Sequence, residues 1–139
     1  MNTKALSALA AIGAAAVMLL TAGCGVGETD AEGKIAQAAD DYLRALADDD
    51  TATACAQVAA TAKSNFGRPC GAELHQVANR IGSDALSAAA DAGVDVTVDG
   101  TRGFAEIRDL DVHLTLAKVG NEWRITSGHA LDAAGGATS

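Results

Sequence analysis

GVDVTVDGTRGFAEI, residues 93–107, is the stretch in which the hydrophobic pattern of the chain changes its period. Valines alternate with polar residues, Asp99-Gly100 follows, and the apolar alternation resumes at Phe104. A period of two on both sides of an Asp-Gly pair predicts a β-hairpin. Residues 112–125 repeat the pattern about Gly120-Asn121, so the sequence predicts a second hairpin there.

Upstream of this stretch, apolar side chains recur at steps of three and four residues, which is typical of amphipathic helices. The first helix is expected over residues 29–48, and Thr29 and Glu32 have the spacing of a capping box at its start. Its apolar face consists of Ile35, Ala38, Ala39, Tyr42, Leu43 and Leu46.

Shorter helices are expected after the first one. The second begins at Asp50 or Thr51 and continues to Ala62, and the third covers residues 71–81. Residues 85–92 form a short fourth helix or an extension of the third. Helices first and antiparallel strands afterwards define an α+β domain with a four-stranded sheet.

Residues 1–23 have the three parts of a secretion signal: a basic start with Lys4, an apolar run and small residues before Cys24. The segment resembles the signal of bacterial lipoproteins, whose cysteine thiol receives a diacylglyceryl group with chains such as palmitate before the signal is cleaved off. Thr21 stands where that family usually has leucine. An uncleaved anchor and ordinary cleavage that leaves a free Cys24 are the alternatives. The resemblance implies a lipid anchor at Cys24, on the extracytoplasmic face of the cell membrane.

The sequence therefore divides into four parts: a signal over residues 1–23, a lipidated tether over 24–30, a domain over 31–127 and a flexible tail over 128–139. Without the signal, the chain has 116 of its 139 residues, which is enough for one domain.

Lipidation of Cys24 would leave an even pair of cysteines, Cys55 and Cys70, fifteen positions apart. A small exported domain with few aromatic residues has a thin core, and a disulfide often compensates for it. A metal site or a reactive thiol is the alternative, but neither cysteine lies in a C-x-x-C motif or near clustered histidines. The sequence predicts a Cys55–Cys70 disulfide.

The charge balance limits the classes of partner. Loss of residues 1–23 removes Lys4 and no acid, so 9 basic residues stand against 18 acidic ones and the net charge is −9. A chain of this charge repels phosphate backbones, and the sequence has no basic stripe that would override the repulsion. We expect no nucleic-acid partner.

Two segments carry a resemblance to a known family. They are YLRALADDD at residues 42–50, followed by Ala54-Cys55, and LTLAKVGNEWRI at residues 114–125. Together they resemble the NTF2-like superfamily, and more narrowly small exported actinobacterial lipoproteins in which the two internal cysteines pair. The resemblance implies a curved sheet that wraps around the helices to form a cone, which is open as a pocket in some members and filled in others.

The same superfamily includes ketosteroid isomerases, so the resemblance also permits an enzyme. Tyr42 matches the tyrosine that those enzymes use as an oxyanion donor. Their catalytic aspartate follows the second helix, whereas residues 62–70 of this chain contain no carboxylate. Because proton abstraction needs a base within reach of the substrate, we expect Tyr42 to be a core residue or to line a pocket, without catalysis.

The remaining polar residues give no catalytic or metal motif, and we expect no cofactor. His75, His113 and His129 are isolated, Asp48-Asp49-Asp50 is better placed to cap a helix than to bind a cation, and Asp111 could pair with His113 along one strand. The expected function is binding of a small apolar ligand or of an envelope protein by a membrane-anchored domain. An isomerase or dehydratase is the alternative.

Overall fold

The computed structural model describes the backbone of residues 26–131 and the side chains from residue 30 onward. The signal expected over residues 1–23 and the lipidation site expected at Cys24 lie outside the described residues, as do residues 132–139 of the expected tail. Between residues 26 and 131, no helix is both long enough and apolar enough to cross a membrane.

The described chain is an α+β domain in which five α-helices precede a four-stranded antiparallel sheet, as the sequence predicts. The helices are α1 (Val26–Ala47), α2 (Thr51–Ala56), α3 (Ala60–Lys63), α4 (Cys70–Ile81) and α5 (Ser83–Ala92). The strands are β1 (Asp95–Asp99), β2 (Arg102–Ile107), β3 (Val112–Val119) and β4 (Glu122–Ser127), with a short 3-10 turn η1 (Arg108–Leu110) between β2 and β3.

The first helix begins at Val26, earlier than the sequence predicts. Thr29 and Glu32 therefore lie inside α1 and not at its start, where a capping box stands, and the tether expected over residues 24–30 is helical from Val26. The fully buried positions of α1 begin only at Ile35, and Ala31 before it is only partly buried against the core. A pattern of apolar residues cannot locate the start of such a helical extension.

The single helix expected from Asp50 to Ala62 is wrong, because the chain leaves the helix after Ala56 and re-enters one at Ala60. Between these points Val58 forms a parallel bridge with Ile125 of β4. The Ile125 N–H donates to the Gln57 carbonyl at 2.7 Å, and the Ala59 N–H donates to the Ile125 carbonyl at 2.8 Å. The edge of the sheet thus takes over backbone bonds that a continuous helix would otherwise make.

Both expected hairpins are present, and the strands follow one another in the sheet in the order β1-β2-β3-β4. Gly100 and Gly120 each take a positive φ, 65° and 66°, at the first position of a two-residue turn. Glycine in this conformation is typical of the hairpin turns that match the twist of the flanking strands.

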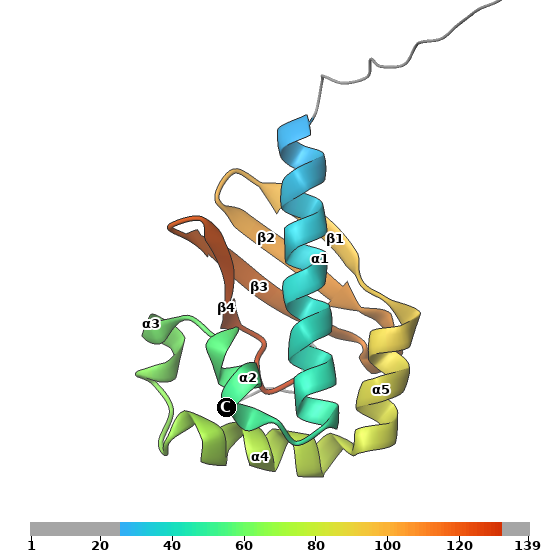
Figure 1. Ribbon diagram of the computed structural model, residues 1–139, viewed down its shortest axis with the longest axis vertical. Coiled ribbons are helices and arrows are strands. Elements are labelled where there is room, and N and C mark those ends of the chain that lie inside the picture. The colour runs from blue at the N-terminus through green and yellow to red at the C-terminus, as the bar shows by residue number, and fades with distance from the viewer. Residues whose placement is uncertain (1–25, 132–139) are drawn as a thin grey trace, which may run out of the picture.

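The core lies between the helices and one face of the sheet. Along β2 buried residues alternate with exposed ones, so the opposite face of this strand is open to solvent. Figure 1 shows α1 running along the sheet and α4 crossing beneath α1 and α2. The largest fully buried side chains include Tyr42, Ile35, Leu43, Leu46, Leu74, Leu86, Ile107, Leu114, Leu116 and Ile125.

The segment after β4 is packed, although the sequence predicts a flexible tail from residue 128. Leu131 is buried in the core cluster. Gly128 comes so close to β3 that an added Cβ would lie 2.1 Å from the His113 carbonyl oxygen. Residues 128–131 form neither a helix nor a strand. An irregular segment has no hydrophobic periodicity, so the sequence pattern could not indicate that these residues are packed.

Candidate functional site

Cys55 and Cys70 form the expected disulfide, with their Cα atoms 6.1 Å apart. This separation lies within the usual range for a disulfide. Cys55 comes from α2 and Cys70 is the first residue of α4, so the bridge fastens two helices that are connected through α3. Neither cysteine is available as a metal ligand or as a nucleophile in this state.

Tyr42 is fully buried on the inner face of α1. Its hydroxyl donates a hydrogen bond to the carbonyl of His129, in the packed segment after β4. Burial raises the pKa of Tyr42 well above its ordinary value; the charge of Arg80 opposes this shift and the charge of Glu73 adds to it. A sealed, neutral phenol with an intramolecular partner is a core residue and is not presented to a substrate.

His75 and His113 lie beside different carboxylates, whereas the ring of His129 packs against Phe66 with the centroids 4.6 Å apart. His75 Nδ1 lies 2.8 Å from an oxygen of Asp49. His113 faces Glu106 on the neighbouring strand, at 3.9 Å, and its expected partner Asp111 lies in the turn before β3 with a positive φ of 54°. Among the described residues, no three side chains of histidine, cysteine, aspartate or glutamate are placed to hold a metal ion.

The Asp48-Asp49-Asp50 run serves local structure. Asp50 caps α2, because its carboxylate accepts from the Thr53 N–H at 3.2 Å and from the Thr53 hydroxyl at 2.6 Å. The hydroxyl bond, followed by the backbone bond, lowers the pKa of Asp50. The capping role expected from the sequence is therefore confirmed for Asp50.

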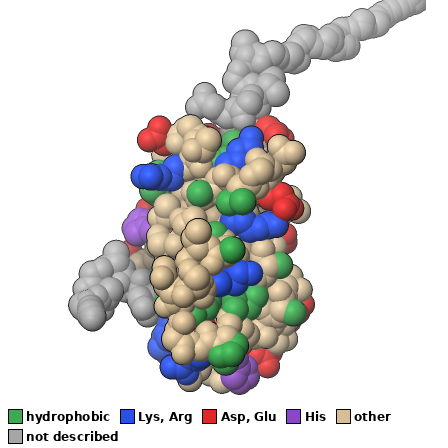
Figure 2. Space-filling view, turned by 90° about the vertical axis from the view of Figure 1, so that its left-hand side faces the viewer, with side chains coloured by type: hydrophobic (Ala, Val, Ile, Leu, Met, Phe, Trp, Pro, Cys, Tyr) green, Lys and Arg blue, Asp and Glu red, His purple; other side chains and the backbone are tan. Residues whose placement is uncertain are grey.

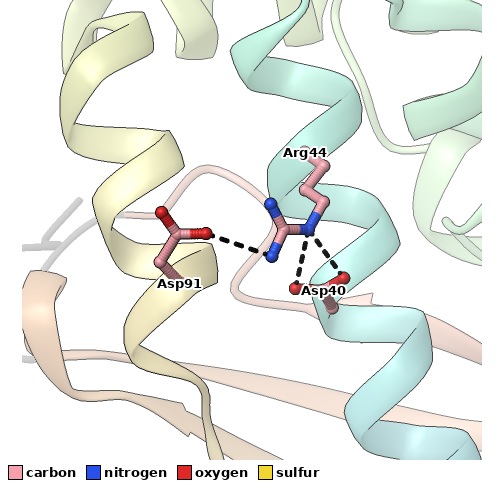
Figure 3. Close-up of polar contacts among 3 residues, drawn as sticks. All are labelled: Asp40, Arg44 and Asp91. Atoms are coloured by element: carbon pink, nitrogen blue, oxygen red, sulfur yellow. Dashed lines mark hydrogen bonds and ion pairs between the residues drawn. The ribbon is translucent and has the colours of Figure 1, made fainter.

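Arg44 joins α1 to α5 on the surface (Figure 3). Its Nε donates to both oxygens of Asp40, at 2.9 and 3.1 Å, and a terminal nitrogen lies 3.2 Å from Asp91. The hydrogen bond to Asp40, and then the charge of Asp40, raise the pKa of Arg44 further. These groups are well exposed, so the network aligns two helices and contributes little to stability.

A cleft of about 310 Å³ opens between the middle of α1 and the β3–β4 turn. The residues that line it come from α1, from the link between α2 and α3, and from the turn and the start of β4: Lys34, Gln37, Ala38, Asp41, Gln57, Asn121, Glu122, Trp123 and Arg124.

Sequence reasoning missed this cleft, although Lys34, Gln37 and Asp41 recur at helical spacing on one face of α1. That spacing was a usable signal for the α1 wall. The sequence contains no comparable signal for Gln57, because its position at the cleft depends on the bridge between the neighbouring Val58 and Ile125 of β4.

A second cleft, of about 360 Å³, lies on the open face of the sheet. It is lined by Asp95, Thr97, Phe104, Glu106 and His113. Phe104 is one of the large apolar side chains exposed in the described chain. Tyr42 lines neither of these two clefts.

The surface in Figure 2 has a mixed character: lysine and arginine side chains lie scattered among hydrophobic ones, and acidic side chains lie nearer the margins. This view shows no broad field of one sign, which is the arrangement that steers nucleic acid or other polyanions toward a protein.

The chain matches no protein-family model, and neither a curated protein nor a solved structure matches it.

Proposed function

We propose that this chain is an exported lipoprotein, anchored through Cys24 to the extracytoplasmic face of the cell membrane, whose domain binds a protein partner without catalysis. The signal-like leader with its terminal cysteine supports the anchor. The Cys55–Cys70 disulfide supports an oxidising compartment, because such bonds persist there and are rare in reducing ones.

We further propose that the domain is NTF2-like, with its cone filled. Helices that precede an antiparallel meander, together with α1 lying along the inner face of that sheet, support this architecture. In a cone of this kind the residues around Tyr42 would line a pocket, but here they are closely packed core side chains.

The burial of Tyr42 is the observation that carries the non-catalytic proposal. An oxyanion donor must point its hydroxyl at the substrate, whereas this hydroxyl is directed to the His129 carbonyl. The segment before Cys70 also lacks a carboxylate that could act as the base. The same packing weakens the expectation of a small apolar ligand at Tyr42, so a protein partner is favoured.

Crosslinking in intact cells, followed by purification of the full-length protein from membranes, tests this proposal. We expect wild type to fractionate with membranes and to capture a defined partner. Cys24→Ser should be released from the membrane and lose that partner, while Ser127→Cys, which adds a thiol far from the leader, remains anchored. Membrane retention of Cys24→Ser would contradict the anchor, and wild type that captures no protein would contradict the partner.

A further inference from the structure

The cleft between α1 and the β3–β4 turn has the properties of a small binding site. Its volume, about 310 Å³, lies at the lower end of the range of ligand pockets. Buried Ala38 and Trp123 are among the residues that line it, and they give it an apolar surface. The remaining lining residues are polar or charged. An apolar wall with several polar groups around it is the usual composition of a site that orients a polar ligand.

The walls of this cleft are held in place by the fold. Gln37 and Asp41 stand on α1, whose opposite face is packed in the core. Gln57 is fixed by the two backbone hydrogen bonds that join residues 57–59 to Ile125. Arg124 lies on β4, paired with β3. Because these side chains stand on ordered backbone, no loop has to be ordered when a ligand binds, which favours affinity.

Four polar side chains of the cleft make no hydrogen bond to another described residue: Gln37, Asp41, Gln57 and Asn121. Three of them are carboxamides, each with donors and an acceptor, and Asp41 is a half-buried acceptor. This set matches a ligand that offers several groups able both to donate and to accept. Hydroxyl groups have that property.

The charges of the cleft indicate a neutral ligand. Lys34 is paired with Asp30 at 3.2 Å, and Arg124 with Glu122 at 2.6 Å. Each of the two basic side chains lies beside a carboxylate, so the cleft has no net positive charge that would attract a phosphate or another polyanion. Asp41 is the charged lining residue without an ion pair among the described residues, and its carboxylate can accept hydrogen bonds from a pair of hydroxyls.

We propose that this cleft binds a neutral, hydroxyl-rich ligand, a short oligosaccharide. Its hydroxyls form hydrogen bonds with Asp41 and with the carboxamides of Gln37, Gln57 and Asn121. The C–H face of a sugar ring packs against Ala38 and Trp123. The proposal goes beyond the proposed function, because it requires neither the lipid anchor nor the protein partner.

Trp123 allows a direct test, because it is the one tryptophan of the sequence and lines the cleft. The full-length protein in a detergent without a sugar headgroup is titrated with trisaccharides of glucose, mannose, galactose and N-acetylglucosamine. Trp123 fluorescence and saturation-transfer NMR are recorded together. We expect at least one of the four sugars to shift the emission saturably and to receive magnetisation from the protein.

Asp41→Asn and Gln57→Ala should each weaken that binding by about tenfold, the loss expected when one or two hydrogen bonds are removed. Both variants should unfold like wild type, because neither side chain bonds to another described residue. The control is Gln76→Ala, on an exposed part of α4 outside the cleft lining, which should bind like wild type. The proposal is overturned if no sugar binds, if both cleft variants bind as wild type does, or if spermidine binds and the sugars do not.

Discussion

Gly103 shows at the scale of one residue how α1 packs on the sheet. A Cβ at this position would lie 2.4 Å from Cδ1 and 3.1 Å from Cγ1 of Ile35, which is itself fully buried. Glycine is therefore required at position 103 for α1 to approach β2 this closely. The sequence alone does not reveal this role, because a glycine in a strand also suggests a β-bulge.

We predict that Gly103→Ala lowers the free energy of unfolding by about 1–3 kcal/mol, because the added methyl forces Ile35 out of its packed position. Urea denaturation of the purified protein measures this. The control is Gly33→Ala in α1, where an added Cβ meets no atom within 4 Å, and this variant should gain about 0.5–1 kcal/mol. Equal stability of Gly103→Ala and wild type would refute the close contact.

Asp50 couples the stability of α2 to pH. Since its hydrogen bonds with Thr53 hold its pKa below the ordinary value, the ionised form stabilises the folded state. This contribution is complete above the unfolded pKa of about 4 and disappears as the pH falls through the lower folded pKa.

Asp50→Ala should therefore lower the melting temperature at pH 7 and narrow its difference from wild type in acid. Thermal unfolding followed from pH 2.5 to pH 7 tests this. A difference that stays constant over the whole range would show that the Asp50 carboxylate does not cap the helix in its ionised form.

At the scale of elements, local sequence signals predicted those parts of the fold that depend on neighbouring residues. Apolar spacing identified α1, and period-two alternation with glycine turns located both hairpins. The break between α2 and α3 could not be predicted, because it results from the contact of Val58 with Ile125, which lies far along the sequence. The packing of Leu131 also depends on distant residues, so the sequence predicts a flexible tail from residue 128.

The disulfide between α2 and α4 makes the helical layer sensitive to reduction. Its closed loop of fifteen residues corresponds to about 3 kcal/mol of stability in the chain-entropy description. We predict that the double variant Cys55→Ala, Cys70→Ala loses about that much in urea denaturation. Dithiothreitol should destabilise wild type by a similar amount and leave the double variant unchanged. If reduced and oxidised wild type unfold at the same urea concentration, the disulfide adds nothing to stability.

The candidate site was less predictable than the fold. The position of Tyr42 on the apolar face of α1 favours a core residue, and its complete burial confirms that prediction. The sequence does not predict the cleft between α1 and the β3–β4 turn, because polar residues on one face of a helix normally point to solvent. They lie near Gln57 and the β3–β4 turn only because of the tertiary fold.

At the scale of the whole molecule, the described domain has a closely packed core on the helical side of its sheet. The two clefts described above both lie at its surface. The domain has a disulfide, and the chain as a whole is acidic, which favours solubility. We propose that Cys24 anchors this folded domain to the outer face of the membrane.

The intact mass of the mature protein, purified from membranes without reducing agent, tests that claim most directly. We predict a chain that begins at Cys24 and carries a diacylglyceryl group, with Cys55 and Cys70 oxidised so that they resist alkylation. A mass that retains residues 1–23, or one that begins at Cys24 without lipid, would contradict the account.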